Sequence, residues 1–368
     1  MPLIEARIGG SNDVEGAFKF LSSKIGKAIS PWPDTSVPRD EKGRYGPVPS
    51  GFLLRPGFVL FEDAIVINNT SMILCRNNTF YPQLCYHHPT RFLEVCTSIK
   101  NLQKDGSCTV DVPDEIDYVD YPAMLIGNSD VYYFWLFYHV TRFLLMQMVQ
   151  NQNEVKCFLN KKTNVFQKQT LELLQIDSTD FDYLNPHATK FRQLYLPAGI
   201  HRQTFTHPGA LEWLRGQLLS TASRPQRRIF LSRRDATRRR LLNEEAVINR
   251  LKVHGFEVIV PTTLSVAEQI EVFSQAEIVV GPHSSGFSNM VFASPKSKLI
   301  EIHNPHWNLG FYRSLTWMMG QQHRQIVGFT QGMFNIIAER KIRSCAGARY
   351  SSFPQRRVFA KAYKMFCF

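Results

Sequence analysis

The segment that decides the fold is residues 279–289, which read VVGPHSSGFSN, together with the apolar approach at 276–280. The apolar run stops at Gly281, a turn of small residues follows, and Phe287 and Val291 then return at helical spacing. This order predicts a buried strand, a tight turn and the start of a helix. In such a unit, backbone N–H groups and the positive end of the helix dipole point to one place. This arrangement favours the binding of an anion there, most often a phosphate. A turn that caps the helix and binds nothing is the alternative.

Strand and helix patterns alternate around this turn. Residues 228–231, 256–260 and 298–302 are strand-like. Helices are predicted after a cap at Asn243 and after the capping box at 265–268. The alternation predicts a parallel, doubly wound α/β sheet, in which ligands bind at the carboxyl ends of the strands.

Polar side chains fall at those carboxyl ends. Arg233 and Arg234 follow the first strand, residues 283–286 follow the third, and Glu301 lies at the end of the fourth. Guanidinium groups suit phosphate oxygens, but successive residues on a strand point in opposite directions, so one of the two arginines is expected to reach the ligand. Glu301 is a candidate acceptor for ribose hydroxyls, with a salt bridge to a nearby arginine as the alternative.

The order and spacing of these motifs resemble glycosyltransferase family 61. The resemblance rests on SRRD at 232–235, RLLNE at 240–244, LSVAEQI at 264–270, GPH at 281–283 and LIE at 299–301. The family's usual turn reads GPHGAGLTN. This chain keeps Gly286 and Asn289 of that turn and has different residues at its variable places, namely Ser284, Ser285, Phe287 and Ser288.

The resemblance implies a GT-B-like α/β architecture, with two Rossmann-like domains and a cleft between them. It implies an inverting, metal-independent transfer from a nucleotide sugar, by preference a UDP-sugar, to a hydroxyl of a glycan, glycolipid or protein, as in polysaccharide biosynthesis. No metal and no cofactor is expected. The residues expected to bind the nucleotide sugar are Arg233, Arg234, Gly281, His283, Ser284, Ser285, Gly286, Asn289 and Glu301.

The composition changes along the chain and divides it into parts. Residues 1–57 are rich in proline and glycine and predict an extended arm. Residues 58–200 predict the acceptor-side Rossmann-like domain, residues 201–208 a linker, and residues 209–330 the nucleotide-sugar-binding domain. Residues 331–368 show neither helical nor strand periodicity and predict a basic, irregular tail.

The N-terminal domain carries a second family motif in altered form. Residues 134–142, FWLFYHVTR, align with His-Trp-x-x-Asp-x-x-Pro-Arg, so that Phe134 replaces the histidine and Tyr138 the aspartate. An inverting transfer needs a base for the acceptor hydroxyl. Tyr138 is a poor base near neutral pH. The next residue, His139, is the other candidate base, and a core histidine with one satisfied hydrogen bond is its alternative.

Two patterns resemble metal sites without fitting them. His87 and His88 stand side by side with no third ligand at a standard spacing. Asp180 and Asp182 form a D-x-D pattern, but their flanks are polar, and such a motif works at the end of an apolar strand. Neither pattern predicts a bound metal.

The net charge of +12 is concentrated in two patches. Residues 223–240 hold eight arginines and one aspartate, or +7, and residues 339–368 hold eight basic residues and one acid, also +7. The remainder is 12 − 14 = −2. A nucleic-acid surface along the whole chain is therefore not indicated, whereas peripheral contact of the patches with a membrane stays open.

Cysteine usage and hydropathy bear on location. The seven cysteines form no C-x-x-C pair, which predicts free thiols in a reducing, cytoplasmic compartment. The most apolar stretch, residues 131–149, contains His139, Arg142 and Gln147 and predicts a buried helix instead of a membrane span.

Three functions fit these patterns. The first is an active inverting glycosyltransferase. The second is a degenerate homologue that binds a nucleotide sugar without transfer, because the N-terminal histidine and aspartate are replaced. The third is nucleic-acid binding through the arginines of 227–240, which lack an interleaved aromatic platform.

Overall fold

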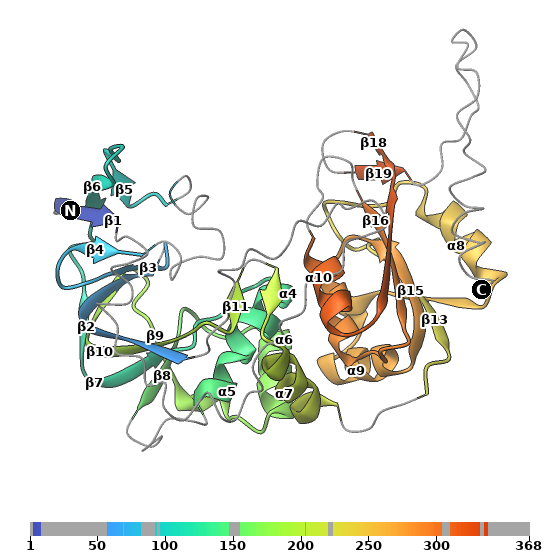
Figure 1. Cartoon of the computed structure of the whole chain (residues 1–368), viewed down its shortest axis with the longest axis horizontal. Coiled ribbons are helices and arrows are strands. Elements are labelled where there is room, and N and C mark those ends of the chain that lie inside the picture. The colour runs from blue at the N-terminus through green and yellow to red at the C-terminus, as the bar shows by residue number, and fades with distance from the viewer. Residues whose placement is uncertain are drawn as a thin grey trace, which may run out of the picture. The chain divides into compact units, whose positions relative to one another are not determined.

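The computed structural model describes residues 3–8, 57–68, 70–81, 93, 96–146, 155–202, 204–219, 224–303, 310–331 and 335–337. The chain divides into two compact units, Met1–Leu218 and Leu219–Phe368, and each is described by itself (Figure 1). His87, His88 and the tail beyond residue 337 lie outside the described residues.

The first unit is built on a ten-stranded mixed sheet with the order β5-β6-β1-β4-β3-β2-β10-β7-β8-β9. The two longest strands, β2 (Gly57–Ile67) and β10 (Ala188–Ala198), pair antiparallel. From β10 onward the sheet is parallel, through β7 (Asp117–Leu125), β8 (Lys156–Leu159) and β9 (Phe181–Tyr183). The remaining strands are β1 (Leu3–Ile8), β3 (Met72–Leu74), β4 (Thr79–Phe80), β5 (Ile99–Lys100) and β6 (Ser107–Asp111).

The sheet of the first unit is mixed, whereas the Rossmann-like domain predicted for residues 58–200 would have parallel strands at its centre. Strands β2 and β3 form a hairpin and pair antiparallel with Ile67 opposite Met72. A connection as short as 68–71 can join only antiparallel neighbours. The short connection accounts for the β2–β3 pair, and the helical crossovers account for the parallel neighbours β7, β8 and β9, whereas the antiparallel pair of β2 and β10 joins strands far apart in the sequence.

Strand β1 lies inside the segment that composition assigns to an extended arm. It pairs antiparallel with β6 and parallel with β4. Its sequence, LIEARI, places Ala6 in the core while Glu5 and Arg7 are exposed. This alternation is a strand pattern, which the proline and glycine content of the whole segment conceals.

A buried helical stretch follows β7, as the apolar residues 131–149 predict. It consists of α4 (Tyr132–Phe134), the π-helix η2 (Trp135–Val140) and α5 (Arg142–Met146). Trp135 and Phe137 are fully buried. Because a π-helix is wider than an α-helix, the side chains after its start take different directions from those that an α-helix would give.

The other helices and short strands of the first unit lie nearer its end. Helix α6 (Val165–Leu173) links β8 to β9 by way of η4 (Ser178–Asp180), and β11 (His201–Arg202) pairs with β12 (Phe205–Thr206). Helix α7 (Pro208–Leu218) follows. The sequence predicts α7 in the C-terminal domain, whereas its contacts place it in the first unit.

The second unit contains a five-stranded sheet with the order β14-β13-β15-β16-β17, in which all neighbours are parallel. This confirms the parallel sheet that the alternating pattern predicts and adds β17 to its edge. The strands are β13 (Arg227–Leu231), β14 (Phe256–Ile259), β15 (Ala276–Pro282), β16 (Lys298–His303) and β17 (Gln322–Val327).

Helices cover both faces of this sheet. Figure 1 shows α8 (Glu244–Lys252) on one side and α9 (Val266–Ser274) and α10 (Phe311–Met318) on the other. The capping box of α9 forms as predicted between Ser265 and Glu268. Asn243 stands at the start of α8 but makes no side-chain cap, so the acidic residues of the first turn support this helix end instead.

One hydrophobic core of the second unit lies between its sheet and α8. Val247, Ile248 and Leu251 of α8 are buried against sheet residues that include Phe230 and Ile300. Each buried aliphatic side chain contributes about 1.5–3 kcal/mol to folding. The 3₁₀ segment η5 (Pro261–Thr263) links β14 to α9, and η6 (Ser285–Phe292) lies between β15 and β16. Strand β18 (Phe329–Gln331) pairs with β19 (Asn335–Ile337).

Thiols and helix lengths complete the description. No helix in the described ranges is both long enough and apolar enough to span a bilayer. Cys75, Cys96, Cys108 and Cys157 are free cysteines. Burial raises the pKa of the Cys157 thiol to about 12 and that of Cys75 to about 11, so both stay protonated and unreactive at neutral pH.

Candidate functional site

Polar residues of the second unit gather at the carboxyl edge of its sheet. Strand β13, the first of this unit, lies between β14 and β15. The strand order therefore reverses direction between β13 and β15. In open parallel sheets ligands bind at this switch point. The segments that leave the two strands carry Arg233 and His283.

Gly281 and Gly286 allow these two segments to approach each other. A Cβ on Gly281 would stand 2.5 Å from the backbone oxygen of Leu231, the last residue of β13. A Cβ on Gly286 would lie 3.0 Å from the Leu231 side chain and 3.1 Å from the Pro261 ring. Both glycines are therefore required for close packing at the switch point, a role different from the ligand contact that the sequence predicts for them.

The turn after β15 caps helix η6. The Ser284 hydroxyl accepts a hydrogen bond of 3.2 Å from the Gly286 N–H, and the Ser284 carbonyl accepts one of 3.1 Å from the Phe287 N–H. Within the described part of the chain, no group accepts from the backbone N–H of Ser284 or Ser285. These two donors at the positive end of η6 are therefore available to an anion.

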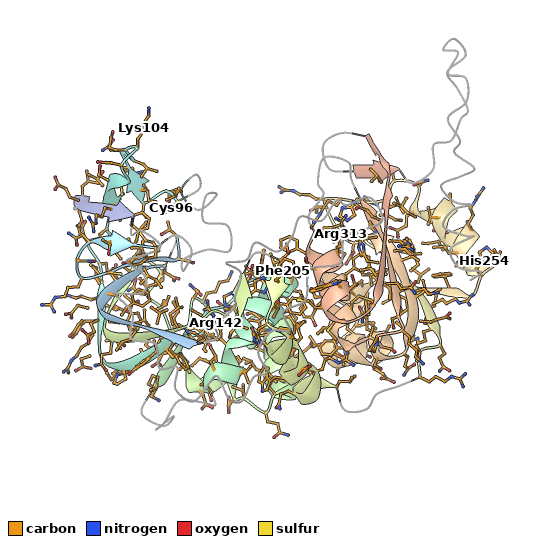
Figure 2. The ribbon with its side chains drawn as sticks, in the orientation of Figure 1. Cys96, Lys104, Arg142, Phe205, His254 and Arg313 are labelled. Carbon is orange, nitrogen blue, oxygen red and sulfur yellow. The ribbon has the colours of Figure 1, made fainter. Side chains whose placement is uncertain are left out.

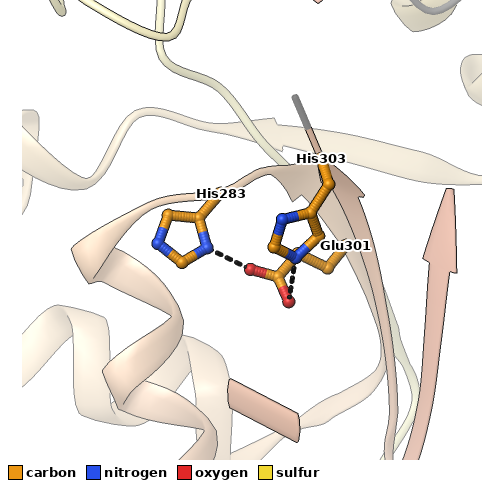
Figure 3. Close-up of side chains that lie close together, drawn as sticks. All are labelled: His283, Glu301 and His303. Carbon is orange, nitrogen blue, oxygen red and sulfur yellow. Dashed lines mark hydrogen bonds and ion pairs between the residues drawn. The ribbon is translucent and has the colours of Figure 1, made fainter. Parts of the chain in front are cut away.

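Glu301 lies at the centre of a histidine cluster (Figure 3). Its Oε1 accepts a hydrogen bond from Nδ1 of His283. Its Oε2 accepts from Nε2 of His303 at 2.9 Å and from Nε2 of His323 at 3.0 Å. The carboxylate is 1% exposed, and both of its oxygens are occupied by histidines, so it is not presented to a ribose as the sequence predicts, nor is it paired with an arginine.

The charges in this cluster depend on one another. Burial by itself would raise the pKa of the Glu301 carboxyl, but the hydrogen bonds from the three histidines outweigh burial and hold the pKa well below its ordinary value. Burial lowers the pKa of His283, and the contact with Glu301 opposes that effect. The carboxylate is ionised, and the imidazole N–H groups satisfy it.

Three members of the cluster, His283, Glu301 and His303, also offer metal-ligand atoms within 4.8 Å of one another. Each imidazole nitrogen, however, faces a carboxylate oxygen, and the 2.9 Å between His303 and Glu301 is an ordinary N–H···O distance. Hydrogen bonds account for this arrangement, and a cation would have to replace the protons that form them.

Two half-buried arginines, Arg233 and Arg239, stand beside the cluster. Burial, and then the charge of Arg239, lowers the pKa of the Arg233 guanidinium to about 10. Burial lowers the pKa of Arg239 as well. Among the described residues neither guanidinium forms a salt bridge, and the Arg233 Nε is buried without a hydrogen-bond partner. The charges of Asp235 and Glu301 oppose these shifts without a direct ion pair, so both guanidinium groups keep N–H donors that could bind an anion.

Tyr312 of α10 forms another side of this region. Its ring centroid lies 5.2 Å from that of His283 and 5.5 Å from that of Phe287. Burial raises the pKa of its phenol, so the side chain stays neutral. Tyr312 and Arg239 were not singled out in the sequence, because Tyr312 follows no motif and Arg239 stands in a run of arginines that reads as a solvated face.

Arg234 and Asn289 are placed differently from the other predicted residues. Arg234 is exposed, and its Nε lies 3.2 Å from the Ser232 hydroxyl and 3.7 Å from Glu244. Asn289 is fully buried, and its amide donates to Gln269 at 2.9 Å, which ties η6 to α9. Both side chains support the local structure in these contacts.

In the first unit, His139 is enclosed by the segment that follows β7. Its Nδ1 lies 2.9 Å from the carbonyl oxygen of Ile126, and a Cβ on Gly127 would come within 3.1 Å of the ring. Burial, and then the nearby Arg142, lowers the pKa of His139 to about 3. His139 is half-buried and one ring nitrogen is bonded to a backbone carbonyl, which corresponds to the core-histidine alternative.

Arg142, labelled in Figure 2, explains why the helical stretch is held at the end of β7. Its Nη1 donates to the carbonyl oxygens of Leu125 at 3.2 Å and Ile126 at 2.7 Å. The motif arginine therefore satisfies the last carbonyl groups of the strand.

Tyr138 projects to a different neighbour. Its ring centroid lies 3.6 Å from that of His201, which follows β10. Nothing in the sequence around His201 marks it, since it lies in the segment predicted as a linker. In the D-x-D pattern, Asp182 accepts a hydrogen bond of 3.2 Å from the Tyr121 hydroxyl.

The second unit is thus an open parallel α/β unit whose switch point gathers arginines, histidines and backbone N–H groups. The family model for Glycosyltransferase 61 matches residues 75–300, more than half of the chain. The chain therefore belongs to glycosyltransferase family 61 and is a glycosyltransferase by descent. No match was found among the curated proteins.

Proposed function

We propose that the chain is an inverting, metal-independent glycosyltransferase of GT-B type that binds the diphosphate of a nucleotide sugar at the carboxyl edge of the second unit's sheet. The observation that carries the proposal is the pair Arg233 and Arg239, which are half-buried, close enough for the charge of Arg239 to lower the pKa of Arg233, and in salt-bridge contact with no carboxylate of the described residues. A nucleoside diphosphate supplies the missing negative charge.

The same groups account for the chemistry of the leaving group. As the bond from the anomeric carbon to the diphosphate oxygen breaks, negative charge grows on the diphosphate. Fixed donors aimed at that charge stabilise the transition state without reorganisation. The two guanidinium groups and the free N–H groups of Ser284 and Ser285 are such donors.

His283 adds a donor whose orientation Glu301 holds. With Nδ1–H bonded to the Glu301 carboxylate, the other ring nitrogen, Nε2, is the one left to face a ligand. A bound diphosphate would favour protonation of Nε2, because the new anion adds to the charge of Glu301. His283 thereby becomes a charge-assisted donor when the donor substrate is bound.

The proposal is tested by nucleotide binding in arginine variants. Arg239→Ala should weaken UDP binding about ten- to hundredfold, since a hydrogen bond to a charged group is worth about 1.5–3 kcal/mol. The neighbouring Arg234→Ala is the matched control, because Arg234 is exposed and turned toward Ser232 and Glu244. Isothermal titration with UDP, UDP-glucose and UDP-N-acetylglucosamine measures both variants against wild type.

Two outcomes would speak against this site. Unchanged UDP affinity in Arg239→Ala would contradict it directly. An equal loss in both variants would indicate general attraction to a basic surface. Release of UDP from a UDP-sugar in the presence of acceptor then distinguishes a transferase from a protein that only binds the donor.

A homologue that binds a nucleotide sugar without transfer is the second candidate. It is favoured by the hydrogen bond that ties one ring nitrogen of His139 to the Ile126 carbonyl, and by the replacement of the motif histidine and aspartate by Phe134 and Tyr138. Nucleic-acid binding through the arginine run has less support, because Arg227 is paired with Glu257 and Arg228 with Glu277.

A further inference from the structure

The loop that carries Arg233 and Arg239, residues 232–240, is attached to helix α8 by one carboxylate. Glu244 is the first residue of α8, and its side chain is 12% exposed. Its Oε1 accepts a hydrogen bond from the hydroxyl of Ser232, which is itself buried. Its Oε2 accepts a longer one, of 3.5 Å, from the backbone N–H of Arg233. Glu244 therefore contacts the first two residues of the loop, directly after β13.

The Arg233 side chain connects the start of this loop to its far part. Its Nη2 donates to the carbonyl oxygen of Arg238 at 3.1 Å. Its own carbonyl accepts from the Ala236 N–H at 3.0 Å, which closes a turn. Arg239, the residue after Arg238, has a φ of 59°, in the left-handed region that residues other than glycine rarely adopt. The contacts of the loop have to hold this conformation, because it is unfavourable by itself.

We propose that Glu244 is a positioning residue for the diphosphate site, because it fixes the loop in the conformation that brings Arg233 and Arg239 together. This inference rests on the proposed binding of a nucleotide sugar. The charge of Glu244 repels a diphosphate. Its favourable contribution to binding therefore comes from the geometry of the loop and not from its charge.

Support of the helix end is the alternative role for this carboxylate. Acidic side chains in the first turn stabilise a helix through its dipole. Glu245 has the same charge in the same turn of α8, but it is exposed and, among the described residues, makes no hydrogen bond or salt bridge to the loop. A comparison of Glu244 with Glu245 therefore separates the role in the loop from the role in the helix.

The test measures UDP binding to Glu244→Gln and Glu245→Gln by isothermal titration. Both substitutions remove one negative charge and keep a side chain of the same size. Circular dichroism first establishes that both variants are folded at the temperature of the titration.

We expect Glu244→Gln to weaken UDP binding about two- to tenfold, although a negative charge has been removed. The amide retains one acceptor of the two that hold the loop, and a net hydrogen bond is worth about that factor. Glu245→Gln should bind UDP as tightly as wild type or slightly more tightly, because it loses a repulsive charge and no contact with the loop.

A second measurement shows whether Glu244 acts through Arg233. In the Arg233→Ala background the connection to Arg238 is already lost, so Glu244→Gln should change the UDP affinity by less than twofold. A residue that only stabilises the fold would change it by the same factor in both backgrounds. Ser232→Ala removes the Glu244 contact from the side of the loop and should weaken UDP binding about as much as Glu244→Gln.

Each contrary result has its own meaning. Equal affinities of the two glutamine variants, tighter binding by Glu244→Gln, or the same factor in both backgrounds would overturn the positioning role. Unchanged affinity in Ser232→Ala would overturn it even if Glu244→Gln did not fold. In these cases the proposed site still stands if Arg239→Ala weakens UDP binding. A wild-type chain that binds no UDP refutes the proposed function and the role of Glu244 together.

Discussion

Glu301 and its three histidines illustrate how a buried charge is accommodated by hydrogen bonds alone. An ionised carboxylate away from water is costly unless its lone pairs are satisfied, and here both oxygens accept from imidazole nitrogens. Two of these nitrogens, on His283 and His303, together with a Glu301 oxygen are also atoms that a zinc ion could use. The metal content of the purified chain distinguishes a hydrogen-bonded carboxylate from a metal site.

We predict that the purified chain contains no stoichiometric metal and that a chelator leaves its midpoint of thermal unfolding unchanged. The reason is that the imidazole N–H groups already occupy the carboxylate oxygens. Elemental analysis by mass spectrometry, and thermal unfolding with and without EDTA, measure this. One equivalent of zinc that resists dialysis, lost in Glu301→Gln, would show that the cluster is a metal site.

His139 leads to a prediction about pH. Its pKa is lowered by burial to about 3, whereas the unfolded chain titrates near 6.5, so below pH 6.5 the unfolded state binds a proton that the folded state does not. Stability from this group is therefore complete above the unfolded pKa and decreases as pH falls toward the folded one. At pH 5 the loss is about 2 kcal/mol relative to pH 7.

The control for this pH effect is His139→Gln, whose amide still donates to the Ile126 carbonyl but does not titrate. Urea unfolding at pH 7 and pH 5 should show a smaller decrease in this variant than in wild type. Buried His207, whose pKa is lowered to about 4, contributes to the decrease that remains. An identical decrease in wild type and variant would contradict the enclosed state of His139.

At the scale of elements, the contact between β13 and β15 depends on a single missing side chain. A methyl group at Gly281 would meet the backbone oxygen of Leu231, which cannot move without shifting β13. Gly286 meets only side chains, which have more freedom to adjust. The candidate site depends on this contact, because Arg233 and His283 lie in the segments that follow the two strands.

We expect Gly281→Ala to destabilise the chain by about 3 kcal/mol or more, at the upper end of overpacking effects, and Gly286→Ala by less. Gly216→Ala is the control, because a Cβ there meets nothing within 4 Å, and an alanine inside helix α7 should stabilise by about 0.5–1 kcal/mol. Denaturant unfolding measures all three. A Gly281→Ala variant as stable as wild type would rule out the close strand contact.

In the whole molecule, each of the two units has its own hydrophobic core. The first is a mixed sheet and the second a parallel one, and the family match extends over parts of both. All groups proposed to hold the diphosphate belong to the second unit. A nucleotide without its sugar should therefore affect that unit alone.

We predict that UDP slows backbone hydrogen exchange at residues 281–287 and 231–234 and leaves β2, β7 and β10 unchanged. Binding suppresses local opening of the segments that it contacts. Hydrogen exchange followed by mass spectrometry, with Arg239→Ala as the non-binding control, reports both regions in one experiment. Protection confined to the first unit would place the nucleotide elsewhere.

The sequence by itself determined the parallel sheet of the second unit, the capping box at Ser265 and the turn at His283, because these depend on local periodicity and on residues a few positions apart. It also indicated a buried helix over 131–149. Its motifs were sufficient to identify the family that the profile match supports.

Only the tertiary structure decided which side chains meet. Gly281, Glu301 and Gln325 stand side by side in register across β15, β16 and β17, so residues twenty or more positions apart become neighbours. The π-helix turns Tyr138 toward His201 and His139 into the core. Periodicity reports which face of an element is apolar, whereas partners across strands depend on register and helix width, which spacing along the chain does not encode.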